Sequence, residues 1–175
     1  MNLFFIGYRC TGKTTIAKSV SEKMGWTFVD ADVMLMEKRG ENITRIVSNG
    51  GWALFRKLEK ETLKTICSRD GQVVATGGGV VLDDENIEIM KMGGPVIWLR
   101  ATAETVFRRM QSDIQTETLR PALTERDLMD EITQTLEERE PLYQKAMSWS
   151  VDTDGKGIMD VINEILIHLK KSGAY

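Results

Sequence analysis

The segment from residue 7 to residue 14 constrains this chain more than any other. It reads Gly-Tyr-Arg-Cys-Thr-Gly-Lys-Thr and fits the pattern G-x-x-x-x-G-K-[ST] at each fixed position. The apolar run Leu3–Ile6 precedes it and a helical pattern follows it, which is the strand, loop and helix order that the pattern requires. A chance match in a glycine-bearing turn is the alternative, and the agreement of all three parts argues against it. The sequence therefore predicts a phosphate-binding loop.

The residue types of this loop suit a nucleotide with its metal ion. Gly7 and Gly12 allow backbone N–H groups to converge on a phosphate, and the N-terminus of the following helix adds its positive dipole end. We expect Lys13 to reach the β- and γ-phosphates and the Thr14 hydroxyl to bind Mg²⁺. The predicted cofactors are thus ATP and Mg²⁺. The loop residues expected at the nucleotide are Cys10, Thr11, Gly12, Lys13, Thr14 and Thr15.

Length and composition predict one globular domain that covers residues 1–175. The formal net charge of −3 gives no attraction for nucleic acid or for an anionic membrane. No apolar run approaches the roughly 18–20 residues of a membrane span, and no basic segment with an apolar core stands at the N-terminus. Cys10 and Cys67 have neither metal-ligand spacing nor a disulfide framework. We expect a cytoplasmic monomer that acts on a small molecule.

Short apolar runs alternate with helical patterns along the whole chain. Such alternation is typical of α/β proteins in which helices cover both faces of a parallel sheet. We therefore predict three layers around a five-stranded parallel sheet. The expected strands are residues 3–6, 26–29, 73–75, 96–99 and 149–152.

Two predicted strands end in residues that suit ligand binding. Asp30 and Asp32 follow the second strand, which we interpret as buried, and ligands of open α/β sheets collect outside the carboxyl ends of strands. Asp32 could also cap the helix that follows, although a cap needs only one aspartate. The third strand runs into Gly77-Gly78-Gly79, which indicates close backbone approach by a ligand or by another segment, with a simple turn as the alternative.

Two arginines in the second half of the chain, Arg120 and Arg139, are candidates for binding anions. Residues 111–127 are polar and weakly periodic, which favours a lid. Within them Arg120 could neutralise charge at a phosphate, or it could be an ordinary surface arginine. Arg139 continues the helical spacing of an apolar stripe and is expected to face an anion.

The charges around Arg56 and Glu59 are interpreted as a solvated helix face, and His168 is interpreted as a surface residue.

Taken together, six pieces of this sequence resemble the shikimate kinase family over nearly the whole chain. They are the phosphate loop, Asp30-Ala31-Asp32, Phe55-Arg56-Lys57-Leu58-Glu59, Gly77-Gly78-Gly79, Leu119-Arg120-Pro121 and Arg139-Glu140-Pro141-Leu142-Tyr143. The resemblance implies a P-loop NTPase fold of the nucleoside-monophosphate-kinase type with a lid loop. It also implies transfer of the ATP γ-phosphoryl group to the 3-hydroxyl of shikimate, a step toward chorismate and the aromatic amino acids.

The resemblance further implies roles for individual residues. Lys13, Asp32 and Arg120 are implied to be catalytic, with Asp32 contacting the substrate hydroxyls and accepting a proton. The substrate-binding residues, within a segment of about 32–61 and beyond it, are implied to be Asp32, Arg56, Gly78, Gly79 and Arg139. Mg²⁺ is implied to lie near Thr14 and, through water, Asp30. The remaining ATP contacts are implied to be Arg109, Arg120 and Lys156.

The chemistry of the implied substrate agrees with these residue types. A small carboxylate with several hydroxyls needs planar cationic donors for the acid and an acceptor for the hydroxyls, and arginine and aspartate fit those tasks. Because of this agreement, we interpret Arg56 as a candidate substrate ligand and not as part of a solvated helix face. Trp52 and Val47 depart from residues that are frequent in the family near the substrate segment.

Two other functions remain open at this stage. A different small-molecule P-loop kinase, for gluconate or a nucleoside monophosphate, shares the loop but does not call for both arginines at one carboxylate. A non-catalytic ATP-binding regulatory module is a further alternative, and intact Lys13, Thr14 and Asp32 argue against it.

Overall fold

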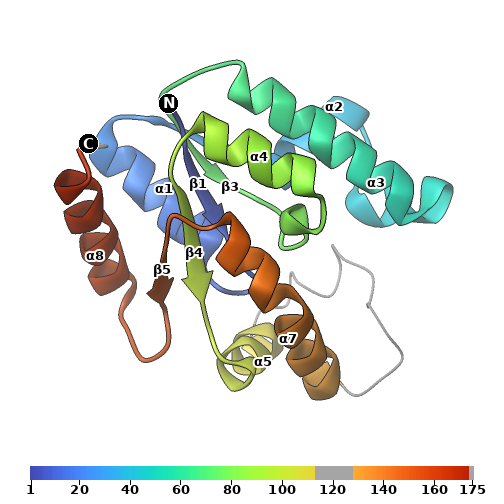
Figure 1. Cartoon of the computed structure of the whole chain (residues 1–175). Coiled ribbons are helices and arrows are strands. Elements are labelled where there is room, and N and C mark those ends of the chain that lie inside the picture. Colours follow the sequence, from blue (N-terminus) through green and yellow to red (C-terminus); the bar gives the residue numbers. More distant parts are fainter. Residues whose placement is uncertain (113–127, 174–175) are drawn as a thin grey trace.

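The computed structural model describes residues 1–112 and 128–173, and Figure 1 shows the arrangement of their elements. The strands are β1 (Leu3–Ile6), β2 (Thr27–Asp30), β3 (Gln72–Ala75), β4 (Val96–Arg100) and β5 (Trp149–Asp152). The helices are α1 (Lys13–Met24), α2 (Ala31–Arg39), α3 (Ile43–Cys67), α4 (Asp84–Gly93), α5 (Ala103–Ser112), α7 (Leu128–Ala146) and α8 (Ile158–Lys171), with a short 3-10 helix η1 (Val80–Leu82).

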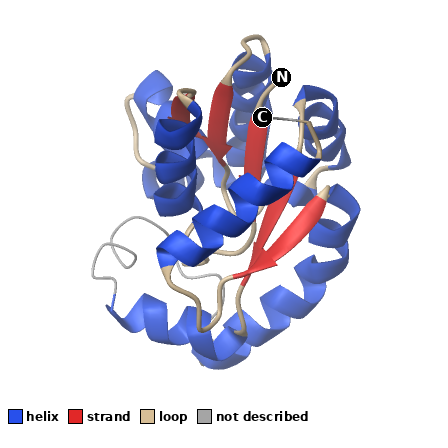
Figure 2. Ribbon diagram, turned by 90° about the vertical axis from the view of Figure 1, so that its left-hand side faces the viewer, coloured by secondary structure: helices blue, strands red, loops and turns tan. Residues whose placement is uncertain are grey.

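The five strands form one parallel sheet in the order β2-β3-β1-β4-β5. Helices cover both faces of this sheet, as Figure 2 shows. Side chains of β1 alternate between the two faces. Leu3 and Phe5 pack in a core with α1 and α8, whereas Phe4 and Ile6 pack in a core with α3, α4 and α7. The predicted three-layer α/β fold with a five-stranded parallel sheet is confirmed.

The strand order brings three functional segments to one edge of the sheet. The β1, β2 and β3 strands are parallel neighbours, so their carboxyl ends open on the same side. The phosphate loop follows β1, Asp32 follows β2 and the three glycines follow β3. This edge is the position at which open α/β sheets bind ligands.

The phosphate loop depends on a glycine at its first position. Gly7 has φ +138°, and a Cβ atom there would lie 2.5 Å from the backbone oxygen of Leu99. Only glycine fits so close to the neighbouring strand in this conformation. Helix α1 then begins at Lys13, as the motif requires.

Local structure departs from the sequence predictions at two places near the site. We predicted β2 as a buried strand, but it is an edge strand with exposed Thr27 and three half-buried residues. Asp30, rather than Asp32, caps α2, because its Oδ1 accepts hydrogen bonds from the backbone N–H groups of Asp32 and Val33. Asp32 therefore does not cap α2.

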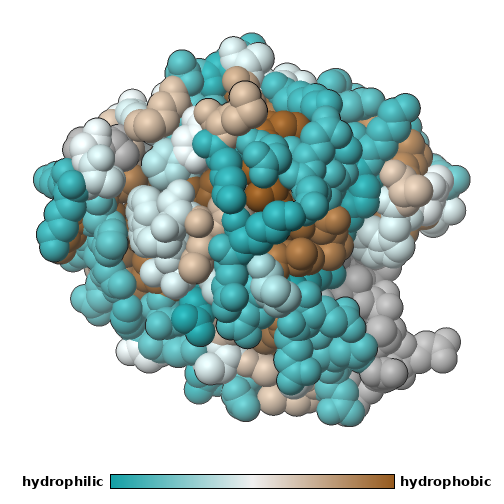
Figure 3. Space-filling model, in the orientation of Figure 1, coloured by the Kyte–Doolittle hydropathy of each residue, from teal (hydrophilic) through white to brown (hydrophobic). Residues whose placement is uncertain are grey.

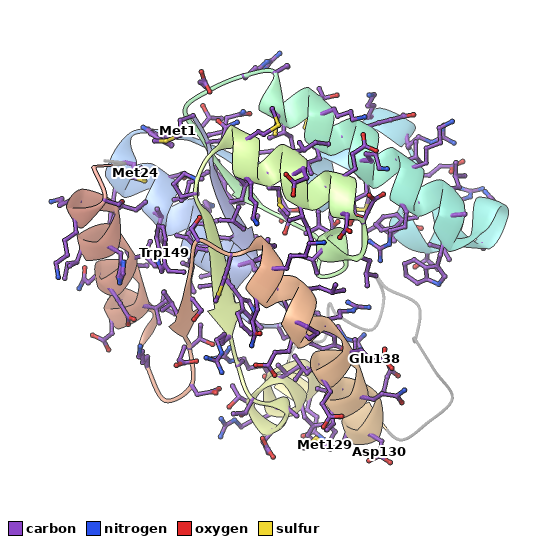
Figure 4. The ribbon with its side chains drawn as sticks, viewed as in Figure 1. Met1, Met24, Met129, Asp130, Glu138 and Trp149 are labelled. Atoms are coloured by element: carbon purple, nitrogen blue, oxygen red, sulfur yellow. The ribbon has the colours of Figure 1, made fainter. Side chains whose placement is uncertain are left out.

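His168 lies away from this edge of the sheet. It is exposed on α8, and its ring stacks on Trp149 with the ring centroids 5.4 Å apart. Figure 4 shows Trp149 on the α8 side of the molecule. The expected surface position of His168 is confirmed.

Figure 3 shows a mostly hydrophilic face, with apolar side chains visible mainly near its centre. Within the described residues, no helix combines the length and the apolarity that a transmembrane span needs.

We expect Asn2→Ala to destabilise the fold without changing its site. Asn2 is buried, its Nδ2 donates to the Arg69 carbonyl at 2.7 Å, and its Oδ1 accepts from the Gln72 backbone N–H at 3.1 Å. The substitution leaves the buried Gln72 N–H without this acceptor and the Arg69 carbonyl with Gln72 Nε2 as its remaining side-chain donor, so the free energy of unfolding should fall by about 2 kcal/mol. Urea unfolding followed by circular dichroism measures this change.

The matched control for this prediction is Met92→Ala. Met92 is 88% exposed, so its truncation should leave the urea midpoint unchanged. Equal midpoints for Asn2→Ala and Met92→Ala would contradict the structural role of Asn2.

Candidate active site

A pocket opens beside the phosphate loop at the carboxyl edge of the sheet. Its empty volume is about 540 Å³. It collects Asp32, Arg56, Gly78, Gly79 and Arg139, which the sequence analysis assigned to the substrate. The remaining lining residues are Tyr8, Arg9, Ile43, Trp52, Phe55, Glu59 and Gly77.

Arg56 reaches the pocket from the second part of α3. This helix kinks at Gly51 (φ 70°, ψ 178°), and Arg56 lies in the part that follows the kink. Its Nη1 donates to Glu59 Oε2 at 2.7 Å, and its Cζ lies 5.1 Å from the centre of the Phe55 ring. Gly79 makes room for it, since a Cβ at Gly79 would collide with Arg56 Nη2. The guanidinium is thus held in a fixed position against the backbone after β3.

Glu59 is a buried carboxyl group, which corrects its assignment to a solvated helix face. Only 5% of its surface is exposed. Burial raises the pKa of Glu59 from 4.5 to about 7, and the neighbouring Arg56 guanidinium opposes this rise only in part. Gly77 lets Glu59 and Asp32 approach, because a Cβ at Gly77 would lie 3.1 Å from Glu59 Oε1 and 2.8 Å from Asp32 Oδ1.

Arg139 enters the pocket from α7. Its Nη1 donates to the Gly78 carbonyl at 3.2 Å, and the Tyr143 hydroxyl donates to the same carbonyl at 2.6 Å. Tyr143 is fully buried, and burial raises the pKa of its hydroxyl above the ordinary range, so it stays a neutral donor. The expectation that Arg139 faces inward from its helix is confirmed, with Tyr143 fixing the glycine backbone beside it.

Asp32 and Asp30 serve different sides of the same strand end. Asp32 is buried and lines the pocket. Asp30 is half-buried, and its Oδ2 accepts a hydrogen bond from the Thr14 hydroxyl at 3.0 Å. One hydroxyl and one carboxylate at the start of α1 suit Mg²⁺, which prefers few protein oxygen ligands and fills its shell with water and phosphates.

Lys13 is oriented by the loop itself. It is buried, and its Nζ donates to the carbonyls of Gly7 at 2.9 Å and Tyr8 at 2.7 Å. These two bonds hold the ammonium group within the loop that is expected to surround a phosphate.

The remaining residues that the sequence analysis assigned to ATP are Arg109, Lys156 and Arg120. Arg109 joins the loop to the turn after β5, because its guanidinium donates to the Cys10 carbonyl and to Thr153. Lys156 is exposed and forms an ion pair with Glu164 at 2.6 Å. Residues 113–127, which contain Arg120 and most of the predicted lid, lie outside the described residues.

Sequence reasoning missed Glu59 and Arg9 as site residues. Glu59 stands four residues after Phe55 and four before Leu63, both of them buried, so helical spacing alone could have placed it on the inner face. Arg9 occupies a variable position of the loop motif, which carries no such signal. Trp52 lines the pocket, whereas Val47 packs in a cluster around Leu35 and Ile43.

Comparison with known proteins gives matches at the level of family and of structure. The family model described as shikimate kinase matches residues 9–170. A shikimate kinase of Thermodesulfovibrio yellowstonii is 39% identical over 165 residues, which cover 94% of this chain and 92% of that protein. The structure of a shikimate kinase from Acinetobacter baumannii in complex with shikimate has a TM-score of 0.90 at 28% identity, and covers 98% of this chain and 93% of that one.

A more distant structural match shows how widely the fold is shared. A gluconokinase from Sinorhizobium meliloti has a TM-score of 0.60 at 16% identity, and covers 97% of this chain and 91% of that one. Such a likeness concerns the fold alone.

We expect Glu59→Gln to reduce the pH dependence of stability. Because the pKa of Glu59 is raised from 4.5 to about 7, its contribution to stability is complete below the unfolded pKa and is lost as the pH rises through the folded one. Between about pH 5 and about pH 8 the wild-type free energy of unfolding should therefore fall by roughly 2–3 kcal/mol more than that of Glu59→Gln. Urea unfolding at both pH values measures the two slopes.

The control for the pH experiment is Glu138→Gln. Glu138 is exposed on α7, so this variant should keep the wild-type slope. Identical slopes for wild type and Glu59→Gln would show that Glu59 titrates as an ordinary carboxyl group.

Proposed function

The chain belongs to the shikimate kinase family, and we propose that it converts shikimate and ATP to shikimate 3-phosphate and ADP through the pocket beside its phosphate loop. The observation that carries this proposal is the meeting of Arg56, Arg139 and Asp32 in that pocket. Two arginines and an aspartate match an acceptor that has one carboxylate and several hydroxyls. The relative from Acinetobacter baumannii is described as a complex with shikimate, which supports the same choice of acceptor.

Binding of the acceptor rests on the two arginines. Arg56 and Arg139 reach the pocket from α3 and α7, so their guanidinium groups clamp the carboxylate from two elements. The backbone N–H groups of Gly78 and Gly79 complete this contact. Placement of this kind supplies much of the catalysis in phosphoryl transfer.

Transfer starts at the hydroxyl that faces Asp32. Asp32 accepts the proton of the 3-hydroxyl as the hydroxyl oxygen forms its bond to the γ-phosphorus and the bond from that phosphorus to the ADP oxygen breaks. Lys13 balances the negative charge of the β- and γ-phosphates during this exchange. Arg120 is proposed to act at the same phosphates.

The nucleotide side of the site uses the loop and its neighbours. Thr14 would bind Mg²⁺ directly and Asp30 through water, and the ion supplies charge neutralisation at the β- and γ-phosphates. Arg109, which bridges the loop and the turn after β5, is proposed to border the adenine. Lys156 is proposed to contact ATP from the turn after β5, where it forms an ion pair with Glu164.

An ADP-release assay with Mg²⁺ and ATP tests the function. Shikimate, quinate, gluconate and AMP are offered as acceptors to the wild type and to Asp32→Asn. We expect saturable turnover with shikimate alone, and a loss of kcat of about 100-fold or more in Asp32→Asn, since removal of a general base typically costs that much. Binding of ATP should persist in the variant.

Asp70→Asn is the control for that assay. Asp70 is 82% exposed and lies before β3, at the end of the sheet opposite to the pocket, so this variant should keep the wild-type kcat. Turnover with gluconate or AMP alone would identify a different small-molecule kinase. ATP binding without any turnover would identify a regulatory module.

Gly79→Ala tests the placement of Arg56. The added methyl group would occupy the position of Arg56 Nη2, so the guanidinium must leave the carboxylate site. We expect the KM for shikimate to rise about tenfold or more, as a lost charge-assisted contact implies, with a much smaller change in the KM for ATP.

The double variant Arg56→Met/Gly79→Ala separates this effect from general disruption. If Gly79→Ala acts by displacing Arg56, the double variant should have the KM of Arg56→Met alone. Fully additive losses would mean that the methyl group disturbs something other than Arg56.

A further inference from the structure

Arg9 is the cation of the phosphate loop that also lines the acceptor pocket. It stands at the third position of the loop motif and shares the pocket with Arg56 and Arg139. Arg56 and Arg139 come from α3 and α7, whereas Arg9 belongs to the segment expected to surround the transferred phosphate. It therefore stands at the boundary between the two substrates.

The guanidinium of Arg9 is held at this boundary by two side chains. Its Nη2 donates to Glu131 Oε1 at 2.9 Å, and its Nε donates to the Tyr8 hydroxyl at 3.2 Å. The Arg9 side chain is 11% exposed and that of Glu131 is 3% exposed. The centroid of the Tyr8 ring lies 5.4 Å from Arg9 Cζ and 5.9 Å from Arg139 Cζ. Both guanidinium groups therefore lie near the same aromatic ring.

Stability alone explains this buried ion pair poorly. Removing two charges from water offsets most of their mutual attraction, so a buried pair is weak evidence for stabilisation. Its place beside a pocket built for anions is more informative. Arg9 has five N–H donors, of which two donate to Glu131 and Tyr8 among the described residues, and a phosphate can use the others.

The charge of the ligand changes during the reaction, and Arg9 lies where it changes. Shikimate has one carboxylate, for which Arg56 and Arg139 are sufficient. Its 3-phosphate adds a second anionic group with about two negative charges, on the side of the pocket nearest to the phosphate loop. Glu131 in turn reduces the net charge that Arg9 presents to that group.

We propose that Arg9 binds the phosphate group of the phosphorylated product, and that its ion pair with Glu131 weakens this binding so that the product can leave. The inference rests on the proposed function, because it concerns the product of that reaction. Arg9 and Glu131 thus have opposite effects on one quantity, the affinity for the product. If the ion pair had only a structural role, loss of either partner would disturb the site in the same way. The two substitutions would then change the affinity for the product in the same direction.

Product inhibition of the wild type, Arg9→Met and Glu131→Gln tests this proposal. The ADP-release assay is run with added shikimate 3-phosphate, and its inhibition constant is compared with the KM for shikimate. We expect the inhibition constant to rise about tenfold in Arg9→Met, as loss of one charge-assisted contact implies, and to fall several-fold in Glu131→Gln. The KM for shikimate should change less in both.

Several outcomes would overturn the proposal. Changes of the inhibition constant in the same direction in both variants would show a structural role for the pair. Equal changes in the inhibition constant and in the KM for shikimate would show that Arg9 does not distinguish product from substrate. Lys145→Met is the control, because it removes a cation that pairs with Asp84 on the surface of α7, and it should leave both constants unchanged.

Two further measurements keep the test decisive. If Arg9→Met does not fold, Glu131→Gln decides alone, because an inhibition constant that is unchanged or higher in this variant contradicts the proposal. Calorimetric titration of shikimate 3-phosphate gives the same ranking of affinities without turnover. A wild type that neither phosphorylates shikimate nor binds its 3-phosphate would overturn the proposed function and this inference together, whereas turnover with the wrong ranking would overturn the inference alone.

Discussion

Parallel pairing of β1 with β3 on one side and β4 on the other is the interaction on which the site depends. Because β2 also runs parallel to β3, the chain must leave three neighbouring strands at the same edge of the sheet. The hydrogen bonds of the strands and the two apolar cores hold that edge rigid, since both faces of β1 are covered. The order and direction of the strands are therefore enough to bring together the loop after β1, the carboxylates after β2 and the glycines after β3.

Charge balance governs what that edge can bind. Three arginines and two carboxyl groups line one pocket, namely Arg9, Arg56, Arg139, Asp32 and Glu59. Burial of so many charges is tolerable only when each is close to an opposite charge or a hydrogen-bond partner. The pairing is incomplete at Glu59, because its buried Oε1 has no hydrogen-bond partner among the described residues. An anionic ligand that enters the pocket meets cations that are positioned before it arrives, which lowers the cost of binding.

Glycine at two of three successive positions, Gly77 and Gly79, makes this density of charge possible. A Cβ at Gly77 would press on Asp32 and Glu59, and a Cβ at Gly79 would collide with Arg56. The run of glycines was predictable as a close backbone approach, but the atoms that approach are side chains of the protein itself. Helical spacing could have revealed that Glu59 faces inward, whereas the capping role of Asp30 depends on how α2 leaves β2.

Features that depend on short-range order could be predicted from the amino-acid sequence. The phosphate loop and the parallel α/β architecture follow from motifs and periodicity that span a few residues. Which charged side chains contact each other depends instead on how distant elements pack. Arg9 and Glu131 are 122 positions apart, and the edge position of β2 follows from the order of strands rather than from its own residues. Such contacts depend on which faces of distant elements pack together, and no local pattern records that choice.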